Sequence, residues 1–305
     1  FAQYDAWRAA FWALIPVTLL FMLLAWAMLP GKSVEAPPRL ILPWLQLVLL
    51  TGVVLAIALG SITPSPLYNA LGLVCGLVLL YAVYRVEGSD RHRMLPKHSL
   101  TPGSALLPIY LSMSLMVIGM TSEVFVPYFL QVLHLQTPLV AGYIAALMAA
   151  GWTLGALYSS GLAPASANRA IRCGPLFVVS GLALAALSVP QIGSSLLSLA
   201  GVCLAMMAVG TGIGLAWPHL LTRVLANVPD SEKDIAGASI TTVQLIATAI
   251  GAALAGMIAN MAGLTTPGGV TGAASAAAWL FGLYAVLSAL LFITVRQVIA
   301  HSAKR

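Results

Sequence analysis

Charged residues are scarce in this chain: Asp, Glu, Lys and Arg together make up 7% of its 305 residues. A water-soluble domain carries roughly a quarter, so the composition excludes an ordinary soluble fold. Cysteine is also rare, and Cys75, Cys173 and Cys203 lie in or beside apolar segments without a CxxC spacing. We therefore expect neither a disulfide nor a metal site.

The motifs of the common enzyme classes are also missing from the sequence. It has no P-loop, no nucleophile elbow and no cluster of histidines and carboxylates with metal-ligand spacing. Gly210-Thr-Gly212-Ile-Gly214 superficially resembles a nucleotide-binding loop, but it lies inside an apolar segment with no preceding strand. The sequence thus predicts no enzyme, ATP-driven pump or cofactor.

The chain is rich in hydrophobic residues, which make up 60% of it and give a mean hydropathy of +0.98. Most of its apolar runs reach the roughly 20 residues that a helix needs to cross a bilayer. Unbroken runs of this kind predict helices and not a barrel. We expect an all-α integral membrane protein, a polytopic helical bundle with nine spans: 10–29, 41–62, 68–86, 104–131, 138–160, 173–190, 196–221, 235–262 and 273–295.

The net charge of +6 reflects topology more than a nucleic-acid partner. Thirteen of the 14 Lys and Arg residues lie in alternate connections between the predicted spans, and Arg8 is the exception. Basic loops remain in the cytoplasm, so we expect Phe1 outside and the C-terminus inside. Nine spans place the two ends on opposite sides, so if the natural N-terminus is cytoplasmic, we expect an odd number of further spans before Phe1.

Small residues recur at a spacing of four in the later spans. Gly151 and Gly155 share one predicted helix, and Gly210 and Gly214 share another. Such pairs allow helix backbones to approach closely in lipid, although smooth faces also suit helices that move. We assign these four glycines, with Pro127 and Pro218, to close packing or hinges.

Four blocks of sequence resemble the fourteen-helix drug:proton antiporter branch of the major facilitator superfamily. They are WRAAFWALIP (7–16), VPYFLQVLHLQTPLVAGY (126–143), GTGIGLAWPHLL (210–221) and VPDSEKDIAGASITTVQLIATAIGAALAG (228–256). The resemblance implies a partial major facilitator transporter fold, with five helices before Phe1. Residues 1–29 would hold the last helix of the N-terminal bundle, 30–100 an inserted, lipid-facing helix pair with its loops, and 101–305 the C-terminal six-helix bundle.

Glu123 is the residue on which a functional interpretation depends, because it is an acid inside the apolar span 104–131. An ionised carboxylate near the bilayer midplane costs several kcal/mol unless it is paired, hydrated or protonated, and such residues usually face a cavity. No predicted span carries a cation at a comparable depth. We therefore predict that Glu123 couples protons to transport. Two structural alternatives are a neutral acid bonded to a helix such as that of Gln244, and an acid paired with an upstream Arg.

Further residues are candidates for lining a substrate cavity, with weaker support from the sequence than Glu123 has. Thr241, Gln244 and Thr248 share one helix face, and Tyr110 and Trp152 could stack on flat or cationic ligands. Gly119 lies one turn from Glu123. Many members of the family that this chain resembles carry Arg at the position of Gln244, so the resemblance supports a role for Gln244 less strongly.

Together these features predict a secondary transporter of a bacterial inner membrane that exports amphipathic or cationic small molecules in exchange for protons. Its partners would be substrate, protons and the bilayer, and a periplasmic adaptor is compatible with the sequence. The alternatives are a dedicated metabolite carrier of the same fold and a truncated remnant that does not transport.

Overall fold

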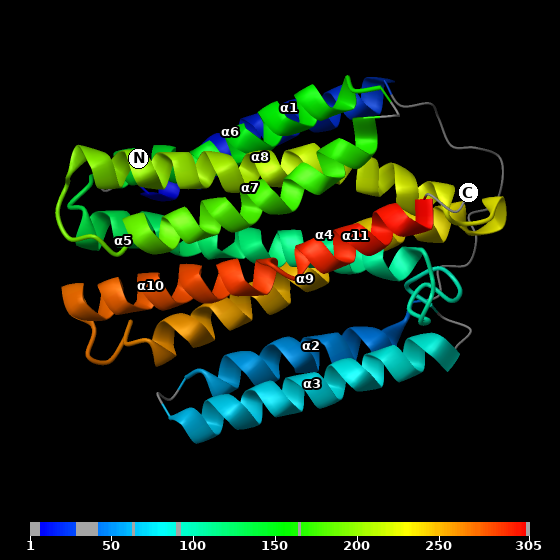
Figure 1. Ribbon diagram of the computed structural model, residues 1–305, viewed down its shortest axis with the longest axis horizontal. Coiled ribbons are helices and arrows are strands. Elements are labelled where there is room, and N and C mark those ends of the chain that lie inside the picture. Colours follow the sequence, from blue (N-terminus) through cyan, green and yellow to red (C-terminus); the bar gives the residue numbers. More distant parts are fainter. Residues whose placement is uncertain (1–6, 29–41, 63–64, 90–92, 164–165, 303–305) are drawn as a thin grey trace.

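The computed structural model describes the chain except for residues 1–6, 29–41, 63–64, 90–92, 164–165 and 303–305. The described part is all-helical and contains no strand (Figure 1). Its α-helices are α1 (Trp7–Met28), α2 (Trp44–Gly60), α3 (Pro66–Ser89), α4 (Leu106–Thr121), α5 (Val126–Leu133), α6 (Pro138–Ser160), α7 (Ala167–Ser188), α8 (Leu196–Ala226), α9 (Lys233–Met261), α10 (Gly269–Ser288) and α11 (Leu291–Ser302), with short 3₁₀ turns η2 (Ser122–Phe125) and η4 (Asp230–Glu232).

Eight segments of the described chain are long and apolar enough to cross a membrane, and α2 is a shorter apolar helix of 17 residues. The chain is therefore a multi-pass membrane protein, as predicted. The predicted span 41–62 is too long, because its helix occupies only Trp44–Gly60. Phe1 and the predicted domain boundary at residues 29 and 30 lie outside the described residues.

The last predicted span, 273–295, lies within the membrane-length segment Gly269–His301, which consists of two helices. The structure has α10 and α11 in its place, separated at Ala289 and Leu290. At this junction the amide of Leu290 donates to Leu287 O and that of Phe292 to Ala289 O, at 3.2 and 3.1 Å. These i to i−3 bonds tighten the turn, as in a 3₁₀ helix, and let the chain change direction.

Span 104–131 also forms, but as α4 and α5 joined by the turn η2. Pro127 has no amide hydrogen, so it cannot donate to the carbonyl four residues earlier, which is that of Glu123. The amide of Val126 donates to this carbonyl instead. The proline thus explains why the helix tightens into a 3₁₀ turn around Glu123.

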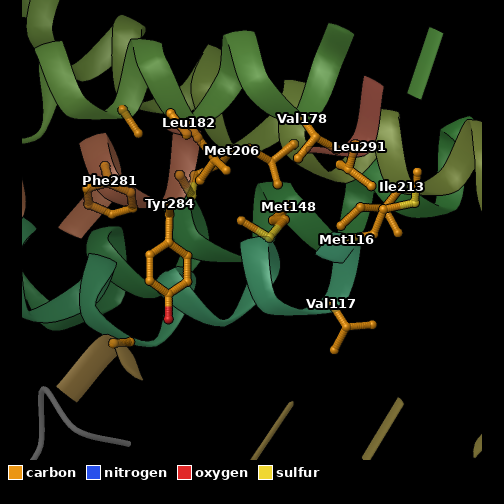
Figure 2. Packing of buried hydrophobic residues seen from close by; sticks show 14 of the residues in the cluster. Met116, Val117, Met148, Val178, Leu182, Met206, Ile213, Phe281, Tyr284 and Leu291 are labelled. Atoms are coloured by element: carbon orange, nitrogen blue, oxygen red, sulfur yellow. The ribbon is translucent and has the colours of Figure 1, made fainter. Parts of the chain in front are cut away.

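The core lies among α4 to α11 and is built from large apolar side chains. Figure 2 shows Met116 from α4, Met148 from α6, Leu182 from α7, Met206 from α8 and Tyr284 from α10 packed in one cluster. Each has a relative exposure of 1% or less. This packing fixes the ends of α4 and α10, which border the turn that holds Glu123.

The pair α2–α3 lies along one side of this bundle (Figure 1) and is not wholly lipid-facing, contrary to our expectation. Val53 and Ile57 of α2 are buried against Met257 of α9. The side-chain amide of Asn260 also donates to the backbone carbonyl of Ser61, at 3.2 Å. The outer faces of both helices remain exposed, so the pair has one protein-facing side and one lipid-facing side.

Candidate functional site

Glu123 lies in η2, between the end of α4 and the start of α5. The continuous segment Leu106–Leu133 has 28 residues, which places Glu123 about 5 Å beyond its midpoint at 1.5 Å per residue. The turn is anchored by Ser122, Val126 and Phe129, which are fully buried. The chain therefore holds this carboxylate within a membrane-length segment, on a turn whose neighbouring residues are buried.

The Glu123 side chain is partly exposed and has no polar partner among the described residues. Within that part of the chain, the ion pairs join Arg93 to Glu232 and Lys233 to Asp230. No hydrogen bond joins Glu123 to Gln244, the bond that would make Glu123 a structural acid. A carboxylate in this setting is free to bind a proton or a cation.

Two neighbouring helices approach closely beside this turn. Gly251 of α9 packs so tightly on α4 that an added Cβ would lie 2.5 Å from Thr121 Oγ1 and 3.1 Å from Ile118 Cα. The Tyr284 hydroxyl of α10 donates to the Gly251 carbonyl at 2.5 Å. The turn around Glu123 is thus supported by three helices, of which α9 carries the predicted polar face.

Replacing Tyr284 by Phe tests this support. The hydroxyl is buried and bonds to a helix carbonyl, so we expect Tyr284→Phe to lower the free energy of unfolding by about 0.6 to 1.7 kcal/mol, the range of hydrogen bonds between membrane helices. Unfolding of the purified protein in mixed micelles would measure it. Tyr143→Phe is the matched control, because Tyr143 is 69% exposed. An equal loss in both variants would contradict the assignment.

The structure does not bring the other predicted cavity residues around Glu123 into one pocket. Tyr110 lies 13 residues earlier, about 20 Å along the helix axis, and its hydroxyl is 2.6 Å from Ser239 Oγ of α9. Gly119 is buried against α7 and α10, where an added Cβ would lie 2.9 Å from Ser288 Oγ. Both residues occupy helix contacts.

Thr241, Gln244 and Thr248 lie on the open side of α9. Thr241 is exposed, and the other two are partly exposed. The hydroxyl of Thr248 donates to the backbone carbonyl of Gln244 at 2.9 Å, whereas the Gln244 amide makes no hydrogen bond to a described residue. This face is therefore available to a ligand or to another helix.

The four predicted glycines lie where α6 and α8 touch. A Cβ on Gly155 would lie 2.7 Å from Thr211 O. A Cβ on Gly210 or Gly214 would meet the carbonyls of Met148 and Trp152. The geometry places all four at a close backbone contact.

Trp152 and Pro218 lie along the same pair of helices. The Trp152 ring is partly buried, with its centroid 5.6 Å from that of Trp217. Pro218 lies within α8, which continues unbroken to Ala226. Because proline lacks the amide hydrogen, it leaves the Gly214 carbonyl without its usual helical donor.

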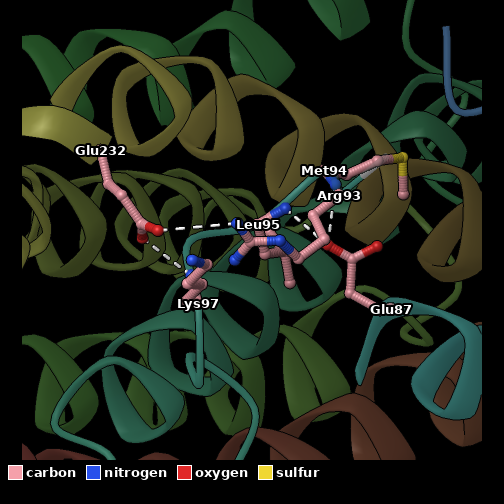
Figure 3. A network of polar contacts seen from close by, with 6 residues as sticks. All are labelled: Glu87, Arg93, Met94, Leu95, Lys97 and Glu232. Carbon is pink, nitrogen blue, oxygen red and sulfur yellow. Dashed lines mark hydrogen bonds and ion pairs between the residues drawn. The ribbon is translucent and has the colours of Figure 1, made fainter. Parts of the chain in front are cut away.

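Sequence reasoning missed a polar network at the other end of the bundle, shown in Figure 3. One oxygen of Glu87 accepts the amides of Met94 and Leu95 at 2.7 and 2.6 Å. Glu232 of η4 accepts the Lys97 amide at 2.8 Å, and Arg93 lies 3.6 Å from it. The available signal was the pair of acids, Glu87 and Glu232, beside otherwise basic connections.

No cluster of three or more histidine, cysteine or acidic side chains suited to a metal ion occurs in the described ranges.

Comparisons with known proteins identify similar transporters. No protein-family profile matches the chain. Two proteins of Mycobacterium tuberculosis, from strains CDC 1551 and H37Rv, are each 35% identical to it over 297 residues, and each is named a probable multidrug-efflux transporter. The match covers 95% of this chain, and the chain spans 61% of the length of these relatives.

Proposed function

We propose that this chain is part of a secondary transporter that exports amphipathic or cationic small molecules in exchange for protons. We assign it to the fourteen-helix drug:proton antiporter branch of the major facilitator superfamily. The names of the two relatives support export, and the four resembling blocks support the branch. Its multiple apolar helices agree with a carrier that works within the bilayer.

The observation that carries proton coupling is the setting of Glu123. Its carboxyl group lies near the middle of a membrane segment, on a turn that proline imposes, with no ion pair or hydrogen bond to a described residue. An acid kept at such depth is usually functional. A structural acid would be expected to have a polar partner on a neighbouring helix.

The proposed cycle uses the two charge states of this one group. The ionised form attracts a cationic substrate from the cytoplasmic side. A proton that enters from outside neutralises the carboxylate, removes the attraction and lets the substrate leave. Release of the proton to the cytoplasm then restores the ionised form, so the proton gradient drives export.

In this cycle most helices would form two moving bundles, and α9 would line the substrate cavity. We propose that α1 ends an N-terminal bundle, that α2 and α3 are an inserted pair, and that α4 to α11 form the C-terminal bundle. The two bundles would rock around a cavity at the bilayer midplane. Thr241, Gln244 and Thr248 would line that cavity from α9. The protein would lie in an inner membrane with its C-terminus in the cytoplasm.

Export by a bacterial host tests this proposal. Cells that express the full-length transporter should accumulate less ethidium than cells with an empty vector, and a protonophore should abolish the difference. Ethidium fluorescence during energised efflux measures the effect. Export that survives the protonophore but stops on ATP depletion would contradict proton coupling. Failure to export any cationic dye would favour a dedicated metabolite carrier.

A further inference from the structure

Two adjoining cavities lie where α3 meets the segment Arg93–Ser104 and the ends of α4 and α9. The first has a volume of about 570 Å³ and the second about 180 Å³. Glu87 and Leu100 line both, so the cavities share a wall. Neither Glu123 nor the predicted polar face of α9 lines them, and the inference below does not rest on the proposed export.

The larger cavity has a mixed polar and apolar lining, and its charged side chains are predominantly basic. Among the described residues, Arg85, Arg93 and Lys97 line it together with one carboxylate, that of Glu87. Arg85 is fastened to Tyr81 by a hydrogen bond of 3.1 Å and lies 5.9 Å over its ring. Its guanidinium group is thereby held at the end of α3, where a membrane helix reaches the headgroup region.

Arg93 lines this cavity and has one unused donor. Its Nη2 lies 3.6 Å from Glu232, and its buried Nη1 has no hydrogen-bond partner among the described residues. A buried donor without a partner costs free energy. The Lys97 side-chain amine also makes no hydrogen bond or ion pair to a described side chain. The bond from Lys97 to Glu232 comes from its backbone amide. The site thus offers unused positive donors to an anion.

Glu87 is the acidic residue among the described residues that line this cavity, and it also positions the backbone next to Arg93. Its Oε1 accepts the amides of Met94 and Leu95, which fixes the backbone directly after Arg93. Its Oε2 is buried and has no hydrogen-bond partner among the described residues. Three cations therefore line this space together with one carboxylate, whose Oε1 is already bonded. Guanidinium groups match the geometry of phosphate oxygens.

The smaller cavity is apolar. It lies between the inserted pair and the bundle, and its lining includes Leu50, Leu80, Val83, Leu111 and Val243 from four different helices. Tyr110 and Ser114 also line it. An apolar cavity that adjoins a basic one near the end of a membrane helix suits an amphipathic molecule.

We propose that these cavities hold one membrane phospholipid. Its headgroup phosphate binds Arg85, Arg93 and Lys97, and the first part of one acyl chain enters the apolar cavity. The lipid would bridge α3 to the bundle, next to the contact between α2 and α9. A free phosphate ion would use the same cations, but it has no use for the apolar cavity.

The test compares phosphatidylglycerol with inorganic phosphate on the purified full-length protein in detergent. We expect phosphatidylglycerol to raise the melting temperature and inorganic phosphate at the same concentration to leave it unchanged. Lys97→Gln should weaken the apparent affinity for the lipid about tenfold, as the loss of one charge-assisted hydrogen bond implies. Ser114→Leu should also weaken it, because the added side chain would fill the apolar cavity.

Arg169→Gln is the control for unspecific attraction, because it removes an exposed cation from α7. It should bind the lipid as the parent does. An equal loss of affinity in Arg169→Gln would overturn the proposed site. Equal protection by inorganic phosphate, with no effect of Ser114→Leu, would make it a phosphate site and overturn the lipid.

Discussion

Glu123→Gln should abolish the active export of a cationic substrate. Glutamine has nearly the size and polarity of the protonated acid but cannot release a proton. The variant would therefore remain in the neutral state of the cycle. We expect active efflux of ethidium to fall to the level of cells without the protein. Downhill exchange of labelled substrate in vesicles should slow as well, because the neutral state does not attract the cation.

Two further variants separate coupling from stability. Glu123→Asp keeps the acid on a shorter side chain and should retain part of the active efflux. Asp234→Asn removes an exposed carboxylate at the start of α9 and should leave efflux unchanged. Full active efflux by Glu123→Gln, at equal amounts in the membrane, would make Glu123 a structural acid.

The second large effect is expected at the contact between α6 and α8. Gly151→Ala places a methyl group on the Met207 carbonyl, and Gly210→Ala places one on the Met148 carbonyl. Backbone atoms cannot rotate away, so the helices must separate. We expect each variant to lower the free energy of unfolding by about 1 to 3 kcal/mol, the usual cost of overpacking. Unfolding in mixed micelles measures this loss.

Gly142→Ala on the same helix is the matched control. A Cβ at Gly142 would have nothing within 4 Å. Since alanine favours a helix over glycine by about 0.8 to 1.0 kcal/mol, this variant should be neutral or more stable. If all three alanine variants had the same stability, the close approach of α6 and α8 would not depend on these glycines.

The course of the membrane segments could be predicted because hydrophobic length is a strong signal. Pro127 also indicated a bend beside Glu123. The break between α10 and α11 was not predictable in this way, because Ala289 and Leu290 include neither proline nor glycine. It lies beside a contact between helices, where Ser288 packs on Gly119.

The contact of α2 with α9 was missed for a different physical reason. Lipid tails are as apolar as leucine, so a face that packs on protein and a face that meets lipid have the same hydropathy. Val53 and Ile57 carry no sign of their partner in the sequence. Asn260 was a polar signal, but its bond to Ser61 joins residues that are far apart in the chain.

In the candidate site, too, some features could be predicted from the sequence and others depend on helix packing. Glu123 stood out because an acid in an apolar run is rare, and its depth follows from counting residues. The positions of Tyr110 and Gly119 within helix contacts depend on how α4 is rotated, which helix periodicity alone left open. Whether Thr241, Gln244 and Thr248 bind substrate remains a prediction.

The most direct test of proton coupling is a measurement of proton flow in proteoliposomes that contain the full-length protein. A pH indicator trapped inside would follow an imposed gradient, acidic inside, while a cationic dye is added outside. We predict that the dye collapses this gradient in the parent and leaves it unchanged in Glu123→Gln. Equal collapse in both would contradict the account and assign proton coupling to another group.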